Sequence, residues 1–97
     1  MDITEEVLTL FKERMHITHS SEDNTLKELL QASYEDIKSK CGVFALDTSY
    51  RGRELVFERT RYVYNDAIEY FDTNFLSMIN SFSIDNLPVE VDTDEGV

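Results

Sequence analysis

Apolar residues recur at helical spacing through two long tracts that contain neither glycine nor proline, residues 1–41 and 53–87. A glycine or proline inside a helix costs about 1 or 3 kcal/mol relative to alanine, so their absence favours helix. From Ile3 to Met15 the apolar side chains repeat every four residues and predict one helix face. We expect Asp2 to cap this first helix, with Glu5 completing a capping box.

A second helix is predicted after a polar break in the pattern. Ser20 or Ser21 is expected to cap it, and its apolar period continues to Cys41. Gly42 is expected to end the helix in a left-handed conformation. The connector that follows should fold back with its apolar residues on the core: Val43, Phe44 and Leu46.

A third apolar stripe begins at Val56 and continues to Phe82. One helix over 53–82 would measure about 45 Å at 1.5 Å per residue. A domain of this size is only about 30–35 Å across. The helix therefore projects beyond the domain or breaks, and we expect the break at Asp72-Thr73-Asn74, whose residue types cap helices better than they propagate them.

After Ser83 the apolar period changes from that of a helix to two. Leu87, Val89 and Val91 alternate with polar residues and proline, which predicts an extended arm able to pair with a partner. The sequence thus predicts an all-α fold. A small bundle of three to four helices is expected over residues 1–83, followed by an extended acidic arm over 84–97.

Charge is distributed one-sidedly along the chain. The formal net charge is −11, and the 36 residues after Arg61 carry eight carboxylates and no lysine or arginine. This acidity argues against direct binding of nucleic acid or of an anionic membrane surface. We expect Asp66, Glu69 and Asp72 to mark the solvent or channel side of the third helical tract.

Catalytic signatures are not found in the sequence. His16 and His19 could form a metal pair, but without nearby cysteines or an HExxH pattern they favour a solvated helix junction. Cys41 is expected to be a packed core thiol, because a helix C-terminus disfavours a thiolate. We therefore expect no enzyme, no metal and no cofactor. A lone cysteine cannot form an internal disulfide, which suits a soluble protein of a reducing cytoplasm.

One basic cluster interrupts the acidic background, and it consists of Arg51, Arg53, Arg59 and Arg61. The i,i+3 spacing of Arg51 with Glu54, and of Glu58 with Arg61, favours pairing within the helix. The alternative is that these arginines meet the acidic end of a neighbouring copy. The other candidate contacts with partner chains are the surplus aromatic residues and the apolar residues of the arm: Tyr62, Tyr70, Phe82, Leu87, Val89 and Val91.

The order of these segments carries a resemblance to a known family. A short acidic helix is followed by Leu26–Ile37 (LKELLQASYEDI), by the turn at Cys41-Gly42, by Arg59–Ala67 (RTRYVYNDA) and by Asn74–Ser81 (NFLSMINS). Over residues 1–87 this pattern resembles the small head–tail connector proteins of long-tailed bacteriophages, also called head-completion or adaptor proteins.

The resemblance implies an all-α structural subunit of the virion, located at the head–tail interface after assembly in the host cytoplasm. Such subunits form a ring of neighbouring copies, commonly a dodecamer, beneath the portal protein. The ring extends the DNA channel and docks the next neck or tail-completion protein. Genome DNA passes through without specific binding, no membrane is involved, and an acidic channel would repel its phosphates.

Two alternatives stay open from the residues. A small acidic inhibitor could mimic nucleic acid and block a DNA-binding protein, although such a mimic would rather lack the Arg51–Arg61 cluster. A helical enzyme subunit or regulator is supported only by His16 and His19.

Overall fold

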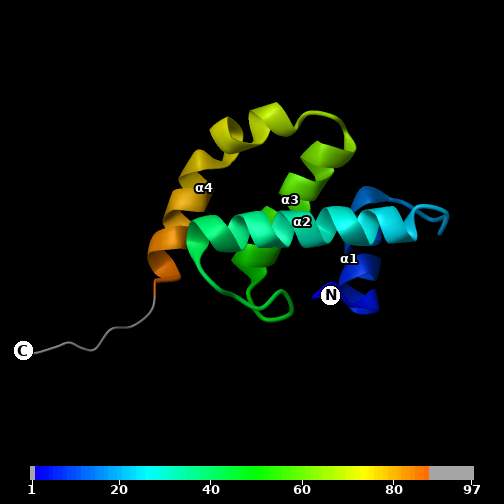
Figure 1. The fold of residues 1–97 in the computed structure, drawn as a ribbon, viewed down its shortest axis with the longest axis horizontal. Helices are drawn as coiled ribbons and strands as arrows, with labels where there is room; N and C mark the ends of the chain where they lie inside the picture. The colour runs from blue at the N-terminus through cyan, green and yellow to red at the C-terminus, as the bar shows by residue number, and fades with distance from the viewer. Residues whose placement is uncertain (1, 88–97) are drawn as a thin grey trace, which may run out of the picture.

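The computed structural model describes residues 2–87, and these form four α-helices and one 3-10 helix without any strand. The elements are α1 (Glu5–Met15), α2 (Asp23–Cys41), α3 (Tyr50–Tyr64), η1 (Ile68–Tyr70) and α4 (Phe71–Asp85) (Figure 1). The predicted all-α fold is confirmed. The arm from Pro88 onward lies outside the described residues.

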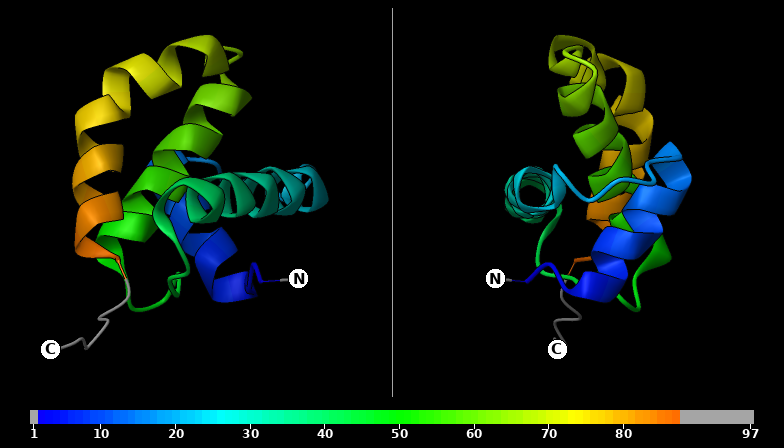
Figure 2. Two further views of the ribbon diagram at one scale, coloured as in Figure 1. Left: turned by 60° about the vertical axis from the view of Figure 1, so that its left-hand side comes forward. Right: turned by 90° about the vertical axis from the view of Figure 1, so that its right-hand side faces the viewer.

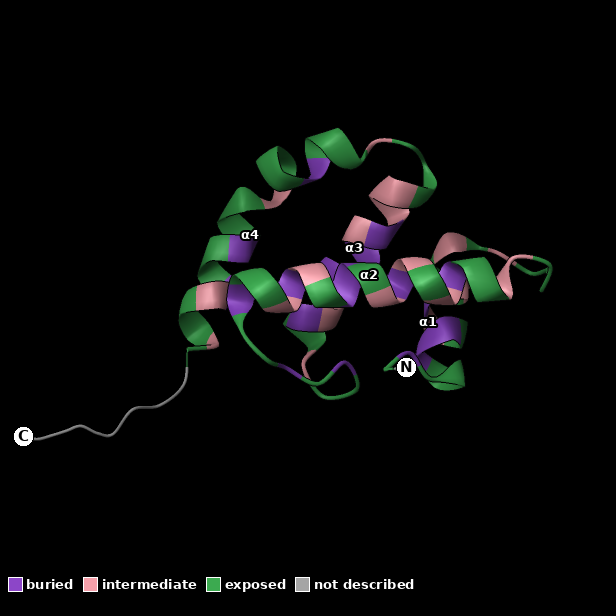
Figure 3. Cartoon of the chain, viewed as in Figure 1, coloured by how far each residue is buried: buried purple, intermediate pink, exposed green. Residues whose placement is uncertain are grey.

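Helix α2 is the central element, because it contacts each of the other three α-helices. Helix α3 crosses α2, and the chain then turns through η1 so that α4 returns to the C-terminal end of α2 (Figure 2). Buried residues lie on the faces that the helices turn toward one another (Figure 3). The core is formed chiefly by α1, α2 and α3, whose fully buried side chains include Phe11, Leu26, Leu30, Ile37, Leu55 and Val56.

The helix starts differ from those predicted. Thr4 caps α1, since its hydroxyl accepts a hydrogen bond from the Val7 amide at 3.1 Å. The backbone amide of Asp2 instead donates to the Gln31 side chain at 2.9 Å and ties the start of the chain to α2. Helix α2 begins at Asp23 without a side-chain cap, so the prediction of a serine cap is wrong. An ion pair of 2.7 Å between Lys12 of α1 and Asp23 holds the start of α2 against α1.

The connector between α2 and α3 is ordered, and two of its three predicted core residues are buried. Gly42 has a positive φ of 91° with ψ at 173°, which is extended rather than left-handed helical. Side chains alternate along an extended backbone. Phe44 and Leu46 therefore point inward, whereas Val43 is 85% exposed, contrary to the prediction.

The third helical tract breaks, as predicted, but at 65–67 rather than at Asp72-Thr73-Asn74. Asp66 has a left-handed backbone with φ 59°, a conformation that aspartate tolerates better than most residues. Asp72, Thr73 and Asn74 instead form the first turn of α4, where a carboxylate favours the positive helix end. Helix α4 then continues to Asp85, two residues beyond the predicted end of the helical domain.

An ionic network joins α1 to α3. The Arg14 guanidinium donates to Glu54 at 2.5 Å and to Glu58 at 2.9 Å, and it lies 5.4 Å from the centre of the Phe57 ring. The hydrogen bond from Arg14 lowers the pKa of Glu54 below its ordinary value. The predicted pair of Glu58 with Arg61 is present at 2.6 Å.

Gly52→Ala is expected to lower the free energy of unfolding by about 1–3 kcal/mol. A methyl group at this position would lie 2.4 Å from carbons of the Phe44 ring. That ring has little room to withdraw, because it packs edge-on against Tyr34 and Phe82. Urea unfolding followed by circular dichroism measures the loss. In combination with Phe44→Leu the change should cost less than the sum of the two single changes; strictly additive losses would contradict this contact.

The Arg14–Glu54 pair should contribute stability only above acidic pH. A carboxyl whose pKa is lower in the folded than in the unfolded state stabilises the fold above the unfolded pKa, near 4.3 for glutamate. This stabilisation is lost as the pH falls through the lowered folded pKa. The free energies of unfolding of the wild-type chain and of Glu54→Gln, measured from neutral to acidic pH, should differ by less than about 1 kcal/mol because the pair is partly exposed. A difference between the two proteins that does not change with pH would rule this contribution out.

Candidate protein-interaction site

Helix α4 is the element with the most apolar surface left outside the core. Only Phe71, Ile79 and Phe82 of its 15 residues are buried. Outside these contacts Leu76 is 56% exposed at the edge of the helix that faces Lys40 of α2, and Ile84 is 68% exposed on the side away from the core. Exposed apolar surface gathered on one element is typical of a surface that binds another protein.

This outer face of α4 also carries no unbalanced charge. The helix has two charged residues, Asp72 near its start and Asp85 at its end. Asp72 pairs with Lys40 of α2 at 2.8 Å, and Asp85 pairs with Arg51 of α3. Both carboxylates are thereby directed to the protein's own cations, and the surface between them is apolar or weakly polar.

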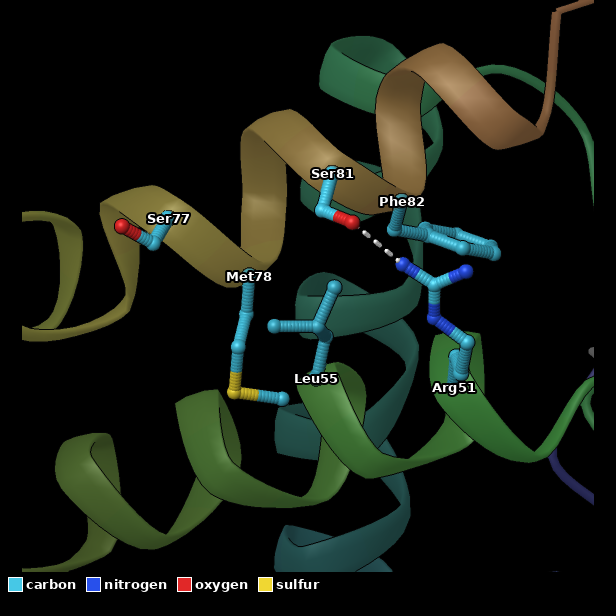
Figure 4. Close-up of a pocket in the computed structure, with 6 residues that line it drawn as sticks. All are labelled: Arg51, Leu55, Ser77, Met78, Ser81 and Phe82. Atoms are coloured by element: carbon cyan, nitrogen blue, oxygen red, sulfur yellow. Dashed lines mark hydrogen bonds between the residues drawn. The ribbon is translucent and has the colours of Figure 1, made fainter.

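A groove of about 290 Å³ lies between α3 and α4. Leu55 and Phe82 are buried beneath it, and Met78 forms one side wall (Figure 4). Ser77, Ser81 and Arg51 supply the polar groups along its margin. An apolar groove with one cation at its margin suits a segment that carries aliphatic and acidic side chains.

Arg51 is the cation at the margin of the groove. Its guanidinium donates to Asp85 and, at 2.8 Å, to the Ser81 hydroxyl, and it lies 5.7 Å from the Phe82 ring centre. An arginine carries five N–H donors, so these two hydrogen bonds leave others for a further carboxylate. Half of the side chain is exposed. The predicted i,i+3 pair of Arg51 with Glu54 is wrong, because Glu54 binds Arg14 across to α1.

The other arginines of the predicted cluster make contacts in different parts of the molecule. Arg59 lies 3.1 Å from Asp36 and donates to the Ser33 hydroxyl at 3.0 Å. Arg61 binds Glu58 within α3. Arg53 stacks over the exposed ring of Tyr50 at 4.9 Å and makes no ion pair within residues 2–87. The four arginines are therefore not one basic patch.

The surplus aromatic residues divide between core and surface. The Tyr62 ring packs edge-on against Phe71 and Phe75, with ring centres 5.7 and 5.6 Å away, and joins α3 to α4. Phe82 is buried and reaches the surface only as part of the groove. Tyr70 is 60% exposed. Leu87 is also exposed, whereas Val89 and Val91 lie outside the described residues.

The three acidic residues predicted to mark a solvent or channel side are all exposed. Asp66 lies in the turn after α3, Glu69 in η1 and Asp72 in the first turn of α4. They therefore belong to three successive elements rather than to one helix. Lys40 balances Asp72, whereas Asp66 and Glu69 pair with no cation of the described part of the chain.

Leu76 and Met78 belong to the predicted third apolar stripe, but neither they nor Ile84 were predicted to contact a partner. A signal for two of them was present. The spacing of Phe71, Phe75, Ile79 and Phe82 defines the inner face of a helix. Leu76 flanks that face, and Ile84 falls on the other side of the helix. The groove itself gives no signal in the sequence, because it joins residues of two helices.

The residues considered for metal or nucleophilic chemistry lie apart. His16 ends α1 with φ 59°, and His19 hydrogen-bonds Ser21 at 3.0 Å. Cys41 is buried with its sulfur 3.6 Å from the Ile79 carbonyl, and burial raises the pKa of the thiol. Within residues 2–87 no three His, Cys, Asp or Glu side chains converge to hold a metal, and no helix has the length and apolarity to cross a membrane.

Comparisons of the chain with protein-family models, curated proteins and solved structures gave no match. The outer face of α4 and the groove beside it are therefore the features from which a function can be argued.

Arg51→Ala is expected to change the free energy of unfolding by less than about 1 kcal/mol, since exposed ion pairs contribute little. Leu55→Ala, one turn further along α3 in the floor of the same groove, should cost about 2–4 kcal/mol because its side chain is 1% exposed. Urea denaturation of both variants measures the difference. An equally large loss at Arg51 would show that it holds α3 and α4 together.

Proposed function

We propose that this protein is a structural head–tail connector subunit of a long-tailed bacteriophage, which forms a ring beneath the portal, extends the DNA channel and docks the next neck or tail component. The observation that carries the proposal is the uncharged apolar face of α4 outside the core. A domain of about this size buries only some 60–65% of its unfolded surface and has few apolar residues to spare. Leaving Leu76 and Ile84 exposed is disfavoured unless another chain covers them.

Val43 and Leu87 extend this apolar surface at one end of the molecule. The Asn86 side chain donates to the carbonyls of Cys41 at 2.9 Å and Val43 at 3.0 Å, so the connector and the end of α4 are held together. Both apolar side chains are thereby presented on a fixed backbone. An interaction surface held in place before binding loses less conformational entropy when a partner docks.

The charge arrangement supports a role beside DNA that does not bind it. Eight of the nine lysines and arginines form ion pairs within the chain. Six exposed carboxylates pair with no cation of residues 2–87: Glu6, Glu13, Glu28, Asp47, Asp66 and Glu69. Repeated around a ring, such residues would give a negative potential that keeps phosphates from adhering.

A nucleic-acid-mimicking inhibitor is the second candidate. The basic cluster that argued against it is largely neutralised within the chain, as the pairs of Arg51, Arg59 and Arg61 show. That function gives no use to the apolar face of α4. Affinity capture that recovers a DNA-binding protein, with portal protein left unbound, would favour the inhibitor.

The full chain mixed with portal protein of the same phage should form a ring on the portal, visible by electron microscopy. Deleting Pro88–Val97 should leave the midpoint of urea unfolding unchanged, because α4 ends at Asp85, before the deleted segment. The deletion should weaken the assembly. Leu76→Glu provides a second variant, since a charge on the outer face of α4 should weaken assembly without disturbing the core.

Failure of the full chain to join the portal at any concentration would refute the proposal. A truncated chain that unfolds would instead place part of the domain within residues 88–97.

A further inference from the structure

The arm has a pattern that fits the groove between α3 and α4. In Leu87–Asp92 aliphatic residues alternate with proline and two acids. Along an extended chain, alternate side chains point to opposite sides and recur every 6–7 Å or so. The arm can therefore place Val89 and Val91 on one side and Glu90 and Asp92 on the other. The groove offers the complement, with an apolar floor of Leu55 and Phe82.

Charge selects the groove over the outer face of α4 as the position for this segment. The arm carries four carboxylates after Leu87 and no cation. Lys12, Lys27 and Arg61 are each engaged by a carboxylate on their own side of the molecule. Lys40, which borders a second cavity beside Leu76, is already held by both Asp36 and Asp72. Arg51 stands at the groove margin, half exposed, with N–H donors beyond those used by Asp85 and Ser81. A second carboxylate can bind there while Asp85 stays in place.

The position of the groove relative to the end of α4 favours the groove of another copy. The groove extends back along α4 from Phe82 to Ser77, whereas the arm begins beyond Asp85. A residue before proline avoids the helical conformation and favours an extended one, so the sequence does not predict that α4 continues into the arm. Ten further residues reach at most about 35 Å when extended. An arm of this length that continues onward from α4 can contact another copy of the chain.

We infer that the arm of one copy occupies the groove between α3 and α4 of the next copy, with its valines against Leu55 and Phe82 and a carboxylate on Arg51. The inference builds on the proposed function, because it names the contact between neighbouring subunits. Arm and groove are different surfaces of one molecule. Their contact is therefore head-to-tail, which is the type of interface that closes into a ring.

Disulfide trapping between full-length chains tests this contact. One chain carries Ser77→Cys in the groove margin, and a second chain, with a different tag, carries Val89→Cys in the arm. A covalent link between the two tags can form only between molecules. Leu76→Cys is the matched control, because it lies one residue away and is exposed but faces Lys40 of α2 instead of the groove. Cys41 is buried and can be kept.

In a glutathione buffer, the Ser77→Cys chain should link to the Val89→Cys chain about tenfold more than the Leu76→Cys chain does, because the groove raises the effective concentration of the arm. Adding Arg51→Ala to the Ser77→Cys chain should reduce the link severalfold. Linking that is equal at both positions would overturn the inference.

In a chain carrying both Ser77→Cys and Val89→Cys, a link within the monomer that does not change on dilution would show that the arm folds onto its own groove, and would overturn it too.

The outcome separates the two proposals. Ring formation on the portal without trapping at the groove would refute the arm contact and leave the connector function standing. Trapping at the groove without any association with portal protein would refute the connector function and retain the contact between copies.

Discussion

The arrangement of this protein depends on a reversal of the chain at Asp66. The backbone there is left-handed, and the amides of Asp66 and Ala67 donate to the carbonyls of Val63 and Tyr62 at 3.0 and 2.8 Å. These hydrogen bonds end α3 and turn η1 and α4 back toward α2. An uninterrupted helix would carry Ile79 and Phe82 away from the core that now buries them. The same reversal brings α4 beside α3 and so creates the groove.

Helix α4 is therefore held along one side only. Phe71, Ile79 and Phe82 attach it to the core, and the ion pairs at Asp72 and Asp85 fix its two ends to α2 and α3. Nothing among the described residues covers the side that carries Leu76 and Ile84. The helix is both a structural element and an accessible surface, which is the combination expected of a subunit that binds through its exterior.

Much of the fold could be predicted from the sequence, because helical periodicity is a local property. The tracts without glycine and proline contain α1, α2, α4 and all of α3 beyond its first turn, which includes Gly52. The excessive length of the third tract correctly required a break. Its position could not be predicted from cap preference alone, since Asn65-Asp66 and Asp72-Thr73-Asn74 are similar in residue type. Packing of Tyr62 against Phe71 and Phe75 favours the first of these positions, and this packing exists only after the chain has turned.

The candidate site was less predictable for a related reason. The pair of Glu58 with Arg61 is local and was found from spacing, whereas Glu54 binds Arg14 forty residues away. Arg51 likewise binds Asp85 and Ser81 across α4. Ion pairs between elements, and a groove formed by two elements, depend on tertiary arrangement. Spacing along one helix carries no information about them.

The close contact of Gly52 with the Phe44 ring has a mechanical consequence for the groove. With no space for even one carbon atom between them, the connector and the first turn of α3 must move together. Arg51 is the preceding residue in that turn, and the hydroxyl of Ser49 accepts a hydrogen bond from the Gly52 amide at 3.2 Å. The backbone that carries the Arg51 guanidinium is therefore held rigidly by the hydrophobic core. A ring built from such subunits would transmit a load at this contact into the core, with little bending at the surface.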